Sequence, residues 1–188
     1  MKILVLGEHN ENEIQQATLC VVDAAKKLGG EIDIMLTTNA SDKVVNQAST
    51  IDSVSKVLHF SNERFQNIVG EDVAECALSI SDDYDFFLTS SSTTGKNILP
   101  RIAAKLDIQQ ISEIIEIIDP KTFKKPIYAG SCIATVSTSQ KKNALTIRTT
   151  SFDKAELGSG SAVVETKNCP DFLLSLIHIS EPTRRGII

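Results

Sequence analysis

The Gly95-Lys96 pair is the part of this sequence closest to a phosphate-binding motif. A P-loop needs a glycine five residues earlier and a serine or threonine after the lysine. Backbone N–H groups then curl around a phosphate, and the hydroxyl binds Mg²⁺. Ser90 and Asn97 occupy these two positions. The sequence therefore excludes a P-loop ATPase and predicts a capped helix with an exposed Lys96. A helix that begins near Thr94 can still attract an anion weakly.

His9 follows an apolar, strand-like run and has Glu8 beside it. It should lie at the carboxyl edge of a sheet, where α/β folds bind ligands. A base role is conceivable, but no nucleophile or metal-ligand set accompanies this histidine, so a structural or surface role is favoured. His59, inside a later strand, has the same interpretation. No Ser-His-Asp, HExxH or CxxC arrangement is present. A short acidic run is typical of a solvated turn and comprises Asp82, Asp83 and Asp85.

Four cysteines lie far apart in the chain, at Cys20, Cys76, Cys132 and Cys169. No pair has the spacing of metal ligands. Cys20 and Cys76 fall on apolar helix faces and Cys132 falls in a strand-like run, so we expect buried free thiols. Free thiols are typical of a reducing compartment, which predicts a cytoplasmic protein without a metal site.

A strand, a polar loop, a helix and a second strand follow one another between Phe86 and Ile118. The apolar run Phe86–Leu88 predicts a strand covered on both faces. The Ser/Thr-rich loop 89–94 can cap the following helix. That helix has apolar residues at 3-4 spacing, namely Ile98, Leu99, Ile102, Ala103 and Leu106. We expect Pro100 to fall at its first turn, where a missing N–H is tolerated. With the apolar run 111–118 as the second strand, this is one βαβ unit of a parallel sheet.

The same alternation runs through the rest of the chain. Further strands are predicted at 3–6, 32–36, 57–60 and 84–88, and helices at 12–28, 44–48 and 68–80. The late strands 127–136 and 144–149 are joined by a short polar turn without a helix, so they should pair antiparallel. The predicted fold is α/β, a doubly wound, mostly parallel sheet with an antiparallel edge hairpin.

Composition and charge narrow the functional classes. The chain has 188 residues, 41% hydrophobic and 23% charged residues, and a net charge of −5. Its length suits one α/β domain. The acidic balance argues against nucleic-acid binding, which needs a basic face. No run reaches the roughly 18 apolar residues of a membrane span, and we expect no signal or transit peptide.

The C-terminal residues are expected to lie outside this domain, which we assign to residues 1–156. The segment LGSGSA opens a predicted exit linker, 157–173, because its glycines precede neither a helix pattern nor a Lys-Ser/Thr pair. The end LSLIHISEPTR resembles a translated sequencing adapter, so 174–188 is expected to be a non-native tail of a truncated gene.

Four blocks resemble, in order, the alpha subunits of electron transfer flavoproteins. KILVLGEH (2–9) resembles the first strand of that family, and TTGKNILPRIAAKLDIQQISEIIEI (93–117) resembles its Thr-x-x-Gly-Lys…Pro-Arg…Ile-Ser-Asp segment. PIYAGSCIATV (126–136) and TIRTTSFDKA (146–155) resemble two later blocks. The resemblance covers roughly residues 1–165. Glu113 departs from it, standing where the family usually has Asp.

The resemblance implies an adenine-nucleotide-hydrolase-like N-terminal domain that acts as a scaffold. In that family an alpha–beta heterodimer carries electrons from acyl-CoA and related dehydrogenases to a quinone oxidoreductase, so the expected role is a carrier and not an enzyme. FAD would sit in a C-terminal alpha domain, absent from this sequence, and this fragment would bind no flavin.

Four questions stay open at this point. Arg101 can pair with a carboxylate of its own domain or of a partner subunit. Arg148, which matches a family arginine, can pair with Asp153 or contact the beta subunit. An alternative function is a free-standing adenine-nucleotide-binding α/β module. Alpha subunits that serve nitrogen fixation or electron bifurcation also remain possible.

Overall fold

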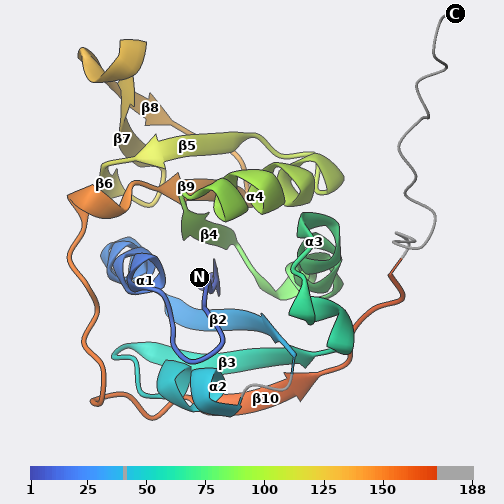
Figure 1. Ribbon diagram of the computed structural model, residues 1–188. Helices are drawn as coiled ribbons and strands as arrows, with labels where there is room; N and C mark the ends of the chain where they lie inside the picture. The colour runs from blue at the N-terminus through green and yellow to red at the C-terminus, as the bar shows by residue number, and fades with distance from the viewer. Residues whose placement is uncertain (40–41, 173–188) are drawn as a thin grey trace, which may run out of the picture.

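The computed structural model describes residues 1–39 and 42–172, and its centre is one parallel sheet (Figure 1). The strand order in this part of the chain is β10-β3-β2-β1-β4-β9-β5, and every neighbouring pair is parallel. The strands are β1 (Lys2–Leu6), β2 (Glu31–Thr38), β3 (Val54–Ser61), β4 (Phe86–Ser90), β5 (Gln110–Ile114), β9 (Asn143–Ile147) and β10 (Val163–Lys167). The order reverses between β1 and β4, which makes this edge the usual ligand-binding position of such folds.

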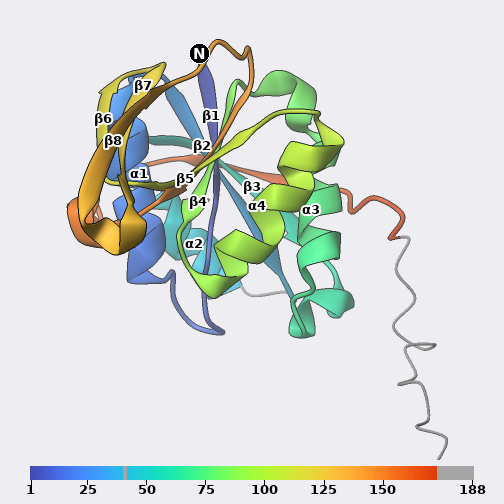
Figure 2. The same ribbon diagram turned by 90° about the horizontal axis from the view of Figure 1, so that it is seen from above.

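Helices cover both faces of this sheet (Figure 2). One face carries α1 (Gln16–Leu28) and α2 (Asp42–Ser49), and the other carries α3 (Gly70–Ser79) and α4 (Thr93–Lys105). Successive side chains of β1 point to opposite faces of the sheet. Ile3 and Val5 pack in the core beneath α1 and α2, and Leu4 and Leu6 pack in the core beneath α3 and α4. Short 3₁₀ turns are η1 (Glu63–Gln66), η2 (Ser81–Asp83), η3 (Tyr128–Gly130) and η4 (Thr149–Ser151). The predicted doubly wound α/β fold is confirmed.

Two helices differ from their predicted bounds. α1 begins at Gln16 and not near residue 12, because Asn10 Oδ1 accepts hydrogen bonds from the backbone N–H groups of Asn12 and Glu13 and folds this segment into a turn. α1 ends at Gly29, which has φ 72°, a left-handed conformation that favours glycine. α4 continues through Pro100, so the prediction of Pro100 in the first turn is wrong. Pro100 lies on the exposed side of α4, where water can reach the carbonyl that loses its partner.

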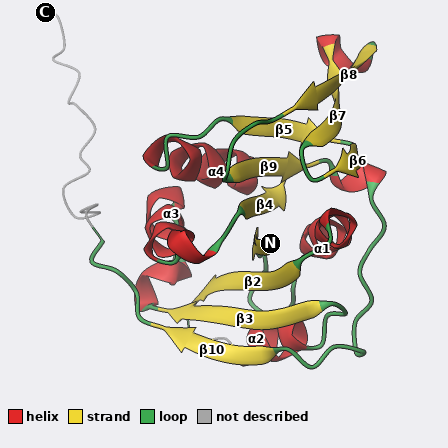
Figure 3. Cartoon of the chain, turned by 180° about the vertical axis from the view of Figure 1, so that it is seen from behind, coloured by secondary structure: helices red, strands yellow, loops and turns green. Residues whose placement is uncertain are grey.

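A second, three-stranded sheet stands beside the first (Figure 3). It comprises β6 (Glu116–Asp119), β7 (Thr122–Ile127) and β8 (Cys132–Ser137), all antiparallel. The predicted pairing of 127–136 with 144–149 is therefore wrong. β8 pairs with β7, whereas β9 inserts between β4 and β5 and is parallel to both. The predicted single strand 111–118 is likewise two strands, one in each sheet.

The segment predicted as an exit linker is partly a strand. β10 adds to the outer edge of β3, in parallel. The glycines before it pack closely on the preceding loop, since a Cβ on Gly160 would lie 2.2 Å from the carbonyl oxygen of Ile51. The backbone N–H groups of Gly158 and Gly160 both donate to the carbonyl of Thr50, at 2.9 and 3.0 Å. Residues 157–167 thus belong to the folded body, and the predicted tail 174–188 lies outside the described residues.

Candidate functional site

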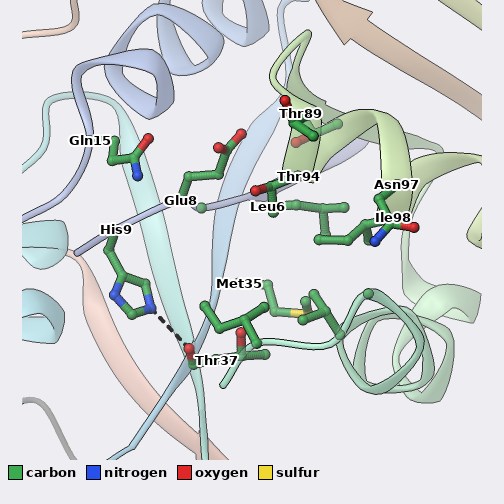
Figure 4. A pocket seen from close by; sticks show the side chains of 15 residues that line it. Leu6, Glu8, His9, Gln15, Met35, Thr37, Thr89, Thr94, Asn97 and Ile98 are labelled. Atoms are coloured by element: carbon green, nitrogen blue, oxygen red, sulfur yellow. Dashed lines mark hydrogen bonds between the residues drawn. The ribbon is translucent and has the colours of Figure 1, made fainter. Parts of the chain in front are cut away.

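A pocket opens at the carboxyl edge of β1 and β4, where the strand order reverses (Figure 4). Its volume is about 300 Å³, at the lower end of the range for small-molecule sites. The walls are mainly apolar and come from Leu6, Met35, Ile68, Val73 and Ile98. The polar lining comes from Glu8, His9, Gln15, Thr37, Thr89, Thr93, Thr94 and Asn97.

Glu8 lies at the start of α4 and is held there by two hydroxyls. Its Oε1 accepts from Ser92 Oγ at 2.8 Å and from Ser90 Oγ at 2.5 Å. Ser92 Oγ in turn accepts from the backbone N–H of Gly95 at 2.9 Å, which caps α4 as the sequence predicts for this loop. A carboxylate is favourable at this position because the helix N-terminus carries partial positive charge. The Glu8 carboxylate therefore places a negative charge beside the start of α4, and this charge would repel a phosphate there.

The Gly95-Lys96 pair has a structural role. A Cβ on Gly95 would lie 2.1 Å from the carbonyl oxygen of Ser90, so the start of α4 can approach β4 only with glycine here. Lys96 Nζ forms an ion pair with Glu113 at 2.5 Å, on the exposed surface. The predicted exposure of Lys96 is confirmed. Its side chain pairs with Glu113 and does not line the pocket.

Both ring nitrogens of His9 face carbonyl oxygens. Nε2 lies 2.9 Å from Thr37 O and Nδ1 lies 2.8 Å from Asn10 O. Neither nitrogen is turned to a substrate in the pocket, which supports the structural role predicted for this side chain. His59 is buried, and its Nε2 lies 2.8 Å from Thr38 Oγ1. Burial lowers the pKa of His59, so its neutral form is favoured.

The acidic run before β4 is mostly solvated, as predicted. Asp82 and Asp83 are exposed in η2. Asp85 instead caps the first strand, because its Oδ2 accepts from the backbone N–H of Lys2 at 2.9 Å.

The cysteines are only partly where the sequence placed them. Cys20 and Cys76 are buried as predicted, and burial raises the pKa of both thiols, which keeps them unreactive. The prediction for Cys132 is wrong, because its strand belongs to the protruding small sheet and its side chain is exposed. Cys169 is half-buried. Within residues 1–39 and 42–172 no cluster of three or more His, Cys, Asp or Glu side chains could hold a metal ion.

The two predicted contact arginines lie in different surroundings. Arg101 bridges α3 and α4: its Nη2 lies 2.7 Å from Glu71 Oε1, and its guanidinium donates to Asn97 Oδ1 at 3.2 and 3.3 Å. Arg148 is exposed directly after β9 and forms no ion pair within the described part of the chain, so the expected pair with Asp153 is not formed. Arg101 is thus satisfied inside the domain, whereas Arg148 is available.

Sequence reasoning missed the two most exposed large apolar side chains among residues 1–39 and 42–172. Tyr128 at the β7–β8 turn is 79% exposed, and Ile133 on β8 is 63% exposed. A strand-like apolar run predicts burial, so nothing in the pattern marked this turn as protruding. The available signal was its charge: residues 120–152 contain six lysines and arginines and no aspartate or glutamate.

The parallel sheet and its two helical layers define a doubly wound α/β domain, in which the Glu8 carboxylate lies beside the start of α4. The family model described as "Electron transfer flavoprotein domain" matches residues 3–171. The chain belongs to the electron transfer flavoprotein family, as its sequence predicted.

Its relatives are named as alpha subunits of that family. The chain is 43% identical over 170 residues to the electron transfer flavoprotein subunit alpha of Pseudomonas aeruginosa, covering 90% of the chain and 55% of the relative. It is 35% identical to the mitochondrial alpha subunit of Dictyostelium discoideum, covering 93% and 51%, and 32% identical to the alpha subunit of Paracoccus denitrificans, covering 91% and 56%. The chain thus spans about half the length of these relatives.

Proposed function

We propose that this chain is the N-terminal scaffold domain of an electron transfer flavoprotein alpha subunit. The complete subunit would pair with a beta subunit and carry electrons from acyl-CoA and related dehydrogenases to a quinone oxidoreductase. It would act as a carrier and break no substrate bond. The observation that carries the scaffold role is Glu8, whose carboxylate fills the anion position at α4.

The residues of the pocket do not fit FAD. The space is about 300 Å³ and the pyrophosphate of a dinucleotide would meet the Glu8 carboxylate at the helix start. Lys96, the cation in the first turn of α4, is paired with Glu113 and so does not offset the Glu8 charge. These features support the proposal that the flavin of the complete subunit binds outside this domain.

The test is a calorimetric titration of the purified chain with FAD and, separately, with AMP. We expect no binding tighter than about 1 mM, equivalent to roughly 4 kcal/mol, for either ligand. Micromolar FAD binding would overturn the scaffold role. Micromolar AMP binding would favour the alternative, a free-standing adenine-nucleotide-binding module.

The proposed partnership has its own test, co-purification of the complete alpha subunit with a beta subunit. Arg148 is the proposed subunit contact with an available charge, and Arg101 is the weaker one because Glu71 already holds it. Within the described residues no helix has the length and apolar character needed to cross a membrane. The cytoplasmic location stays a prediction, since some relatives are named as mitochondrial.

A further inference from the structure

The chain that follows β10 lies against the side of the domain that carries α3 (Figures 1 and 2). The ring of Phe172 meets the ring of Phe65 edge to face, with 5.8 Å between the centroids. Arg64 Cζ lies 5.0 Å from the centre of the Phe172 ring, and Arg64 Nε donates to Asp72 Oδ2 of α3 at 2.8 Å. Such aromatic and cation–π contacts stabilise the packing of a segment. Residues 168–172 are therefore held on the domain beside η1 and α3.

Two thiols, those of Cys76 and Cys169, come together in this contact. Cys76 lies on α3 one turn after Asp72, on the same side of the helix, and it is fully buried. Cys169 is half-buried, packs against the core that contains Cys76, and its thiol donates to the carbonyl oxygen of Ser61 at 3.5 Å. Burial is the largest cause of the raised pKa of each thiol. The hydrogen bond between the two side chains raises the pKa of Cys76 further and partly opposes the rise at Cys169. The pair thus combines one covered thiol with one that solvent reaches.

The other two cysteines lie in different surroundings. Cys20 is buried in the core beneath α1 and α2, on the opposite face of the sheet. Cys132 is exposed on β8 in the small sheet. Within the described part of the chain, neither joins the core that holds Cys76 and Cys169. These two cysteines are therefore suitable controls for chemistry at the pair.

We infer that Cys76 and Cys169 are a site of oxidative modification, at which a peroxide converts the two thiols into an intramolecular disulfide. The Cys169 thiolate attacks one oxygen of hydrogen peroxide, the O–O bond breaks, and a sulfenic acid and one water form. The Cys76 thiolate then attacks the Cys169 sulfur, the S–O bond breaks, and a second water leaves. In total the two thiols lose two electrons and two protons, and the peroxide takes up both and becomes two waters. Cys76 needs no access to solvent, because it reacts only with the sulfur beside it.

The disulfide would fix the segment after β10 to α3. A cross-link between positions distant in the sequence stabilises a fold by restricting the unfolded chain, and it prevents local opening of the segment that it holds. In the proposed complete subunit, this segment would join the domain to the rest of the chain. The fixed exit therefore rests on the proposed function, whereas the disulfide itself does not.

The first test is peptide mapping of the chain that carries Cys132→Ser, which removes the exposed thiol. The protein is treated with hydrogen peroxide, its remaining thiols are blocked with N-ethylmaleimide, and it is digested without reductant for mass spectrometry. We expect linked peptides of Cys76 and Cys169 from monomeric protein, and their loss after treatment with dithiothreitol. Linkage should form faster at about pH 9 than at about pH 7, since more of each thiol is then thiolate. Two unmodified thiols, Cys169 recovered only as a sulfinic or sulfonic acid, or a link between two chains overturns the inference.

Limited proteolysis gives the second measurement. Trypsin cleavage after Lys167, just before the held segment, should slow at least about tenfold on oxidation, because cleavage requires local opening. Cleavage after Lys141, exposed in the loop between β8 and β9, is the matched control and should not change. Cys169→Ser should abolish both the linked peptides and the slowing, whereas Cys20→Ala should keep both. Linked protein that is cleaved after Lys167 as fast as reduced protein overturns the fixed segment, and the reverse behaviour of the two variants overturns the assignment of the pair.

Discussion

Tyr84 donates a hydrogen bond from its hydroxyl to Asp33 Oδ2 at 2.6 Å, and both side chains are buried beneath the α3–α4 face of the sheet. The other carboxylate oxygen of Asp33 has no hydrogen-bond partner within the described chain. Burial is the largest cause of a raised pKa for Asp33, and the Tyr84 hydrogen bond opposes it only in part. Lys2 and Lys56 line the same small pocket and lower the pKa of Asp33, but burial outweighs them, so the charged form of Asp33 is disfavoured in the fold.

Asp33→Asn should stabilise the protein more at neutral pH than in acid. The folded-state pKa of Asp33 lies above its ordinary value of 3.8. At a pH well below 3.8 both the folded and the unfolded state hold the proton. As pH rises from 3.8 through the folded-state pKa, the unfolded state loses its proton first, so the wild type becomes less stable, by about 1.4 kcal/mol for each pH unit that separates the two pKa values. The asparagine variant has no such loss.

Chemical denaturation at about pH 4 and pH 7 measures the difference in unfolding free energy between variant and wild type. That difference should grow with pH. Asp82→Asn, at an exposed position of η2, is the matched control and should show no growth. A difference that shrinks with pH would mean that the Asp33 carboxylate is stabilised in the fold.

Gly95→Ala should destabilise the protein by about 1–3 kcal/mol or more. The new Cβ would meet the backbone carbonyl of Ser90, which cannot move without displacing β4 or α4. Gly70→Ala is the matched control at the start of α3. The nearest atoms there belong to the amide end of Asn97, 2.7 Å from the added Cβ, and this flexible side chain can turn away. Thermal unfolding should separate the two variants, and equal losses would contradict the close α4–β4 approach.

Glu8→Ala should cost about 1–3 kcal/mol of unfolding free energy, because the hydroxyls of Ser90 and Ser92 lose a charged acceptor. The variant should also gain what the wild type lacks, stabilisation by millimolar inorganic phosphate, since the anion position at α4 becomes open. Glu13→Ala, which removes an exposed carboxylate five residues along the chain, should change neither quantity. A wild type that phosphate stabilises as strongly as the variant would contradict the filled anion position.

The two-layered α/β core could be predicted from the sequence because its strands are continuous apolar runs. β1, β3 and β4 lie within a few residues of the predicted strands. A strand covered on both faces appears in the sequence as a continuous apolar run, so it can be recognised without knowledge of its neighbours. Ser92 as the cap of α4 follows from local chemistry in the same way. Glu8 as its partner does not, because 84 residues separate the carboxylate from the hydroxyl.

The small sheet could not be predicted, for reasons visible at Glu113 and Ile114. The apolar run 111–118 has no turn residue, yet Glu113 takes φ 59° and the pairing of β5 with β9 shifts there, so the chain leaves one sheet for the other. The position of β9 between β4 and β5 depends on pairing with residues distant in the sequence, so no local pattern predicts it. Cys132 was expected to be buried because an apolar strand in a projecting hairpin has the same sequence pattern as an apolar strand in a core.

Arg148→Ala should weaken association with the beta subunit, whereas Arg101→Ala should not. Arg148 is an exposed cation without an ion pair among the described residues, so its removal should lower affinity by about tenfold and flatten the salt dependence of binding. Arg101 already pairs with Glu71 on the surface, so its removal should cost less than about 1 kcal/mol of stability and leave the affinity within about twofold. Titration of the complete alpha subunit with the beta subunit in a calorimeter, at two salt concentrations, measures the affinity of each variant and its salt dependence. The opposite ranking would place the subunit interface on the α3–α4 face and not near the end of β9, where Arg148 lies.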